Sequence, residues 1–257
     1  MYSLLNSLLC DKKDGIFFSC FGIWHFGYIL LAALLLTFAI LYMNKKDDSA
    51  KQKLLNGIIT TVFCLYISDF FLMPIAYGEI YIENLPFHIC TAMCVMCFLS
   101  RRVNFLKKYR VNFALLGFVC NLVYLIYPAG VMWHQVHPLS YRVLATLLFH
   151  GLMTVYGAFS LICEGYMLEW KKCYRDLVIT ISTTAWAIFG NHLYNGVGGD
   201  YSFRYNWFFV IKDPFGLFPI ETAQYVMPIL NIAMFFSVQM LVYLVVIKCR
   251  SGQNKRY

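Results

Sequence analysis

The sequence predicts an all-α integral membrane protein with seven transmembrane helices, the N-terminus outside the cell and the C-terminus in the cytoplasm. Of the 257 residues, 60% are hydrophobic and only 13% are charged, about half the charged share of an ordinary soluble domain. The apolar residues form seven runs with no polar linker between them, which indicates a single domain. Most of the 21 Lys and Arg residues lie in the connections after runs one, three and five and in the tail. Cytoplasmic loops are enriched in Lys and Arg, so this sorting predicts the orientation and an odd number of crossings.

Each predicted span is a run of apolar residues that approaches or reaches the roughly 20 needed to cross a bilayer. The spans cover residues 23–43, 54–76, 85–100, 111–127, 139–162, 174–193 and 223–247. The third ends early at Arg101 and Arg102, and the fourth ends at Pro128. The predicted organisation is an N-terminal interfacial segment (1–22), a seven-helix transmembrane domain (23–248) and a basic cytoplasmic tail (249–257).

The net charge of +8 does not indicate nucleic-acid binding, because the basic residues are confined to short loops beside apolar runs. In such loops they mark the cytosolic side and contact anionic lipid headgroups. We therefore expect a multi-pass protein of the cell membrane whose partner is membrane lipid. Nucleic acid and cofactors are not expected.

Polar side chains inside predicted spans are costly in a bilayer, and those that persist tend to face the protein interior and carry function. The set comprises His25, Asp69, His88, Cys90, Asn121, His150, Asn191 and His192. Under the predicted orientation every member lies between the bilayer midplane and the outer surface, and we expect no comparable set in the inner halves. This predicts a polar pocket that opens outward. Asp69 is equally compatible with hydrogen bonding between helices, and for Asn121 this is the more usual role.

His88 and Cys90 are the candidates for nucleophilic chemistry at the start of the third span. Two positions on a helix differ by about 200° of rotation, so they would point to opposite sides. A Cys90 nucleophile would therefore need a base from another span, and His150 and His25 are the candidates. Its thiolate would need a His or a helix N-terminus to stabilise it.

Other candidates complete the predicted site. His88 or His150 would act as general base, with His25 and Asp69 contributing to substrate binding. Asn121 or Asn206 could donate a hydrogen bond to a developing oxyanion. Asn206 lies in a long loop at residues 195–222 that is rich in aromatic residues, which indicates either a lid or an aromatic belt at the headgroups. A metal site would need His25, Asp69, His88 and His150 to converge, and no local spacing supports it, so no metal is predicted.

Four short motifs carry a family resemblance. They are FFSCFGIWH at residues 17–25, LPFHIC at 85–90, FHG at 149–151, and NWFFV at 206–210 followed by KDP at 212–214. In this order they resemble the YwaF family of bacterial integral membrane proteins, although Phe87 stands in place of the family's Leu and Phe149 in place of its Ser. That family is similar to the eukaryotic transmembrane protein 164 group of Cys-dependent phospholipid acyltransferases. The resemblance implies lipid chemistry at Cys90.

The sequence leaves three functional hypotheses open. The leading one is a lipid acyltransferase or lipid hydrolase with an outward-facing polar pocket. The second is a small-molecule or ion transporter or binding protein, although paired breaks in mid-span, which many transporters show, are not evident. The third is a membrane subunit of a larger complex, in which the polar groups hold helices together.

Overall fold

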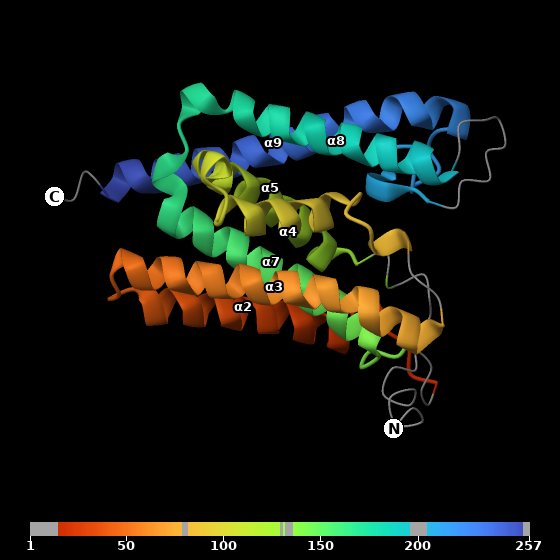
Figure 1. The fold of residues 1–257 in the computed structure, drawn as a ribbon, viewed down its shortest axis with the longest axis horizontal. Coiled ribbons are helices and arrows are strands. Elements are labelled where there is room, and N and C mark those ends of the chain that lie inside the picture. The colour runs from red at the N-terminus through yellow and green to blue at the C-terminus, as the bar shows by residue number, and fades with distance from the viewer. Residues whose placement is uncertain (1–14, 79–81, 129–130, 132–135, 196–204, 254–257) are drawn as a thin grey trace. The chain divides into compact units, whose positions relative to one another are not determined.

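The computed structural model describes residues 15–78, 82–128, 131, 136–195 and 205–253. Most of the predicted interfacial segment and the last four residues of the tail lie outside these ranges. The described residues contain seven α-helices and no β-strand, which confirms the all-α prediction (Figure 1). The helices are α2 (Ile23–Met43), α3 (Asp48–Tyr77), α4 (Ile89–Ser100), α5 (Arg110–Ile126), α7 (Tyr141–Glu164), α8 (Tyr174–Asn195) and α9 (Ile220–Gln253). Short 3-10 turns include η2 (Asn104–Tyr109) and η5 (Trp207–Phe209).

Five helical segments in the described part of the chain are long and apolar enough to cross a membrane. They are Ile23–Met43, Asp48–Ile75, Asn104–Ile126, Tyr141–Met167 and Ile220–Cys249. Helix α4 has only 12 residues and is about 18 Å long, shorter than the hydrocarbon core of about 30 Å. Helix α8 has 22 residues but carries Thr, Ser and Asn side chains along its length. The structure therefore confirms five of the predicted spans by length and composition, and it does not confirm a count of seven.

The chain divides into two compact units. The first unit comprises Met1–Tyr81 and Cys120–Ser160, and the second comprises Ile82–Val119 and Leu161–Tyr257. Helices α5 and α7 each contribute residues to both units. Each unit has its own buried residues and its own polar contacts.

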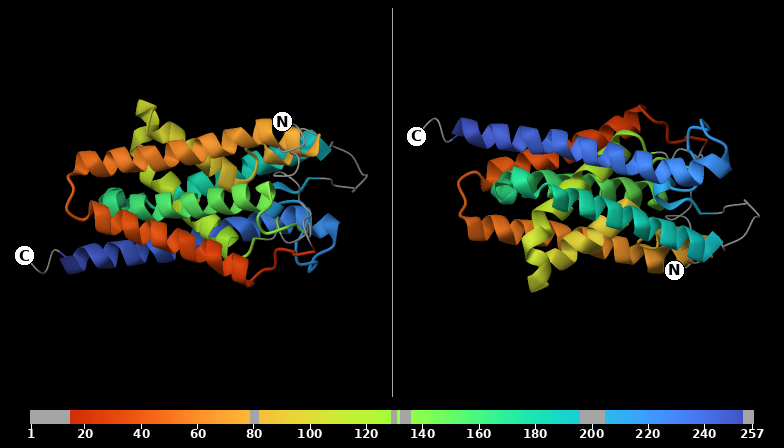
Figure 2. Two further views of the ribbon diagram at one scale, coloured as in Figure 1. Left: turned by 90° about the horizontal axis from the view of Figure 1, so that it is seen from below. Right: turned by 90° about the horizontal axis from the view of Figure 1, so that it is seen from above.

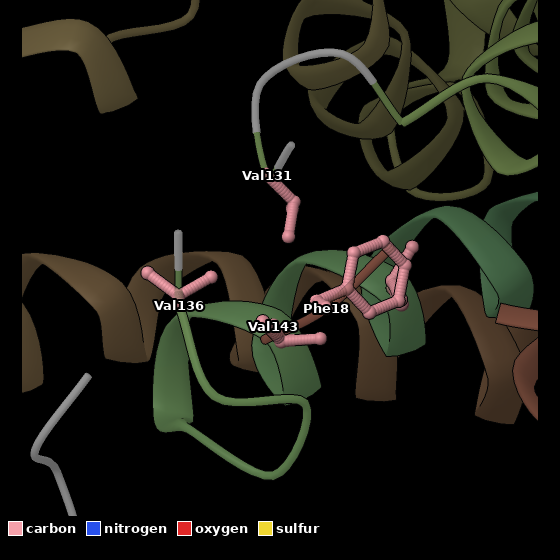
Figure 3. Packing of buried hydrophobic residues seen from close by; sticks show 5 residues of the cluster. Phe18, Val131, Val136 and Val143 are labelled. Atoms are coloured by element: carbon pink, nitrogen blue, oxygen red, sulfur yellow. The ribbon is translucent and has the colours of Figure 1, made fainter. Parts of the chain in front are cut away.

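In the first unit, α2 and α3 form an antiparallel hairpin joined by a short turn (Figure 1). The Asp47 side chain accepts a hydrogen bond from the backbone N–H of Ala50 and so caps the start of α3. A buried cluster joins the segment before α2 to the start of α7 (Figure 3). Its members are Phe18, Val131, Val136, Val143 and Leu147. The backbone N–H of Phe18 also donates to the Val136 carbonyl at 2.8 Å, which anchors this segment to the unit.

In the second unit, α8 packs along α9, a helix of 34 residues that Figure 2 shows along its length. The segment that leads into α4 packs closely on α8, because a Cβ atom on Gly190 would lie 2.3 Å from the Phe87 ring. The aromatic loop before α9 contributes Tyr205 and Trp207 to the same cluster. Tyr205, Trp207 and Phe208 are all buried, which favours a packed loop over an exposed aromatic belt.

The second unit also contains buried polar groups at the helix ends that the sequence predicts to be cytoplasmic. They are Asn112, Glu164, Asp176, Thr180 and Gln239. Glu164 is 1% exposed and lies 2.8 Å from a guanidinium nitrogen of Arg101 and 2.8 Å from one of Arg110, just beyond the predicted spans. The other four lie within predicted spans, in the halves that the predicted orientation places inside. The expectation that the inner halves hold no comparable polar set is therefore wrong. These groups persist there because each charge has a partner of opposite sign or a hydrogen bond.

Candidate functional site

In the first unit, a histidine on α7 is held by two side chains of α5. His150 is 7% exposed, and its Nδ1 lies 2.7 Å from the Asn121 Oδ1. The Tyr124 ring stacks on the imidazole with centroids 3.7 Å apart. An amide oxygen only accepts hydrogen bonds, and the Asn121 Nδ2 donates to the Cys120 sulfur, so the network assigns the His150 proton to Nδ1. The Nε2 of neutral His150 then carries a lone pair that can accept a proton.

The second histidine of the first unit, His25, uses both ring nitrogens. Its Nδ1 accepts the backbone N–H of Phe21 at 2.9 Å, and its Nε2 donates to the Leu125 carbonyl at 2.7 Å. The side chain is fully buried. These bonds tie the segment before α2 to the end of α5, which favours a structural role for His25 over a role as base or substrate ligand.

Asp69 links two helices of the first unit. The Tyr141 hydroxyl at the start of α7 donates to the Asp69 carboxylate on α3. Of the two explanations that the sequence left open for Asp69, this contact favours hydrogen bonding between helices. Asn121, by contrast, positions His150.

In the second unit, His88 and Cys90 lie at the start of α4. His88 is the N-cap residue, and Cys90 is the second residue of the helix and is buried. The positive end of the helix dipole stabilises a thiolate at such a position. A reactive Cys90 needs either a His or a helix N-terminus to stabilise its thiolate, and α4 provides the helix N-terminus.

The His88 ring is oriented by a backbone amide. The Phe208 N–H donates to the His88 Nδ1 at 3.3 Å. Neutral His88 therefore carries its proton on Nε2, where it is a hydrogen-bond donor. This arrangement favours a donor role for His88 over that of a general base.

The turn that supplies this amide has an unusual backbone. Phe208 and Phe209 have φ angles of 60° and 51°, which bulky residues rarely adopt and which cost about 1–3 kcal/mol each. Asn231 on α9 donates to the Phe208 carbonyl at 2.9 Å, and the Asn191 amide on α8 exchanges two 2.9 Å hydrogen bonds with the Trp207 backbone. These two asparagines hold the turn. Asn191 belongs to the polar set predicted from the sequence, whereas Asn231 does not, although it too is an amide within an apolar span.

Asn206 closes the loop that follows this turn. Its Oδ1 accepts the N–H groups of Ile211 and Lys212 at 3.1 Å each, and its Nδ2 donates to the Lys212 carbonyl. The amide is thus used within the loop, which favours a loop-closing role over that of an oxyanion donor.

Asp213 continues the same loop. Desolvation acts in the opposite direction, but the backbone N–H groups of Phe215, Leu217 and Phe218 hold the pKa of the Asp213 carboxyl below its usual range. The charged carboxylate therefore fixes the approach to α9.

Within the described ranges, no group of three or more His, Cys, Asp and Glu side chains has an arrangement that could hold a metal ion.

The apolar helices and the buried polar groups at their ends define an all-helical membrane protein. The chain belongs to the TMEM164 family, whose sequence model matches residues 20–248. The match includes His88, Cys90, Asn121 and His150. No curated protein and no solved structure matches the chain. The narrower resemblance to the YwaF family stays a prediction.

Proposed function

We propose that the protein is a membrane lipid acyltransferase that carries the acyl group on Cys90. A base takes the proton of the Cys90 thiol, and the thiolate attacks the ester carbonyl of a phospholipid. The ester carbon–oxygen bond breaks, the protonated base gives its proton to the leaving oxygen, and the lysolipid leaves as an alcohol. The hydroxyl of an acceptor lipid then attacks the thioester, takes the acyl group and returns its proton to the enzyme. With water as the acceptor, the same steps give lipid hydrolysis.

The position of Cys90 at the N-terminus of α4, two residues after the oriented donor His88, is the observation that carries this proposal. In the first unit, the hydrogen bond between the His150 Nδ1 and Asn121 leaves Nε2 as a proton acceptor, as a general base requires. The stacked Tyr124 ring presents its electron-rich face to the cation that forms when His150 is protonated. His25, the other base candidate, uses both ring nitrogens in backbone hydrogen bonds. His150, positioned by Asn121, is therefore the base candidate of the first unit.

His88 supports the same chemistry in another way. It immediately precedes α4, and its Nε2–H is a donor fixed in direction by the Phe208 amide. The His88 backbone is extended and not helical, so the 200° separation expected within a helix does not apply to His88 and Cys90. A preorganised donor at the reacting carbonyl stabilises the oxyanion of a tetrahedral intermediate. We assign this function to His88 in place of the general-base role.

We also infer that α4 and α8 are further crossings, so that seven spans cross the cell membrane with the N-terminus outside. Helix α8 is about 33 Å long, and without these two crossings the basic residues at 101–110 and 171–175 would lie outside, against the usual distribution. The short α4 can cross where the bilayer is locally thinner. A green fluorescent protein fused after Tyr257 should fluoresce, and alkaline phosphatase fused there should be inactive. Phosphatase fused after His137, in a predicted outer loop, should be active. Active phosphatase at the C-terminus would contradict the orientation.

A trapped intermediate tests the acyltransferase proposal. We expect the purified protein in liposomes to take up label from an acyl-labelled phospholipid as a hydroxylamine-sensitive adduct on the peptide that contains Cys90. Cys90→Ser should abolish the adduct and the turnover. Cys64→Ser should change neither, because Cys64 is an exposed thiol on α3. Undiminished turnover in Cys90→Ser would reject the proposal, and uptake of intact lipid without ester cleavage would favour transport.

A further inference from the structure

The second unit contains a groove between α4, η2 with the start of α5, and α8. Its volume is about 570 Å³. Along its length it is lined mainly by apolar side chains, among them Ala92 and Met96 of α4, Phe113 of α5, and Val178 and Ile179 of α8. We call it the α4–α8 groove. Its shape and lining suit a hydrocarbon chain.

One end of the α4–α8 groove is basic. The Arg175 guanidinium lies 5.3 Å from the centre of the Tyr109 ring, and the Lys108 ammonium lies 4.9 Å from the same ring. Tyr109 and Arg175 both line the groove. Two acidic side chains interact with Arg175: Asp176, which is buried and accepts a hydrogen bond from Asn112, and Glu169, which also pairs with Lys172. Lys171 and Lys172 act on Glu169 as well, so the basic groups here outnumber the acidic ones. The end of the groove is therefore positively charged.

The other end is closed by aromatic side chains. The Trp186 indole donates to the Pro86 carbonyl at 2.8 Å, and its ring lies 5.0 Å from that of Phe87. From Arg175 to Trp186 the groove follows α8 for about 16 Å at 1.5 Å per residue. This length matches the hydrocarbon depth of one leaflet, about half of 30 Å.

The groove is separate from the proposed reaction site. Its lining positions on α4 are Ala92, Met93, Val95 and Met96. With 100° of rotation per residue, the average direction of these four side chains lies about 140° around the axis of α4 from the direction of Cys90. A molecule in the groove is therefore not the lipid that reacts with Cys90.

We propose that the α4–α8 groove binds one anionic phospholipid as a resident lipid. The headgroup phosphate binds Arg175, whose fork of donors suits a phosphate, with Lys108 adding positive charge. One acyl chain extends along the apolar lining to the Trp186–Pro86 contact. The charge of the basic end selects an anionic lipid over a zwitterionic one.

Binding measurements on the purified full chain in detergent test this proposal. Phosphatidylglycerol should bind and raise the melting temperature, whereas phosphatidylcholine should bind more weakly. Arg175→Gln should weaken phosphatidylglycerol binding about tenfold, because it removes a charged hydrogen-bond donor. Val178→Trp should also weaken binding, because the larger side chain fills the apolar part.

Two controls make the result specific. Lys46→Gln removes a similar cation, 5.4 Å from the Tyr42 ring at the end of α2, and should leave lipid binding unchanged. Inorganic phosphate at the same concentration should give no shift, since it cannot fill the apolar lining. Equal binding of both lipids, or unchanged binding in Arg175→Gln, would overturn the proposal. These readouts need no catalysis, so they are independent of the outcome at Cys90.

Discussion

Replacing His88 by alanine is expected to lower the rate of lipid acyl transfer by about 10²-fold or more, the usual loss when one donor to a developing oxyanion is removed. The physical reason is the hydrogen bond from the Phe208 N–H to the His88 Nδ1, which leaves the Nε2–H as a donor of fixed direction. Asn231→Ala should give a smaller loss, because the donor remains but the turn that orients it loses a hydrogen bond. Initial rates with a fluorescent phospholipid in liposomes measure both effects.

Rescue by a conservative variant distinguishes loss of a donor from a structural defect. His88→Gln keeps a side-chain N–H donor and should recover part of the rate lost in His88→Ala. A structural defect would instead lower the melting temperature and would leave the rate low in both variants. His137→Ala, in a loop, serves as the matched control and should retain the parental rate. A His88→Ala variant with a full rate would show that another group stabilises the oxyanion.

Replacing Glu164 by glutamine is expected to destabilise the protein by about 3–5 kcal/mol, the usual effect of removing one partner from a buried ion pair. Glu164 is the shared partner of Arg101 and Arg110, and both pairs have distances of 2.8 Å. The neutral amide would leave two guanidinium groups near the end of α7 without a compensating charge. Unfolding of the purified protein in increasing denaturant measures the change in the free energy of unfolding.

A surface pair of the same kind provides the comparison. Glu169 and Lys172 form an ion pair with side chains 53% and 40% exposed. Glu169→Gln should leave the free energy of unfolding nearly unchanged, because exposed pairs contribute little. If both glutamine variants had the same small effect, the Glu164 contacts would not stabilise the buried end of the second unit.

The sequence predicts the long apolar helices well, because length and composition decide whether a segment can cross a bilayer. It predicts α4 and α8 less well, for different reasons. Helix α4 begins only at Ile89, after the chain has packed Phe87 against Gly190, and this contact depends on residues about 100 positions apart. Helix α8 places its polar side chains toward buried partners, so its hydropathy falls although it is long enough to span.

The residues of the site are visible in the sequence, but their roles are not. His25, His88 and His150 are all imidazoles in or near apolar spans. Only their hydrogen-bond partners distinguish the structural role of His25 from the donor role of His88 and the proton-acceptor role of His150. The ion pairs of Glu164 could not be predicted from the sequence, because Arg101 and Glu164 each resemble a loop residue at the end of a span. Their pairing joins positions that are 63 residues apart.

The length of α9 has a consequence for how the protein meets its membrane. At 1.5 Å per residue, 34 residues extend about 51 Å, which exceeds the 40–45 Å between the outer surfaces of the headgroup layers. Such a helix must incline from the bilayer normal or extend its end into water. Thinner or thicker membranes should therefore change the tilt of α9, and the protein can adapt to hydrophobic mismatch through this one element.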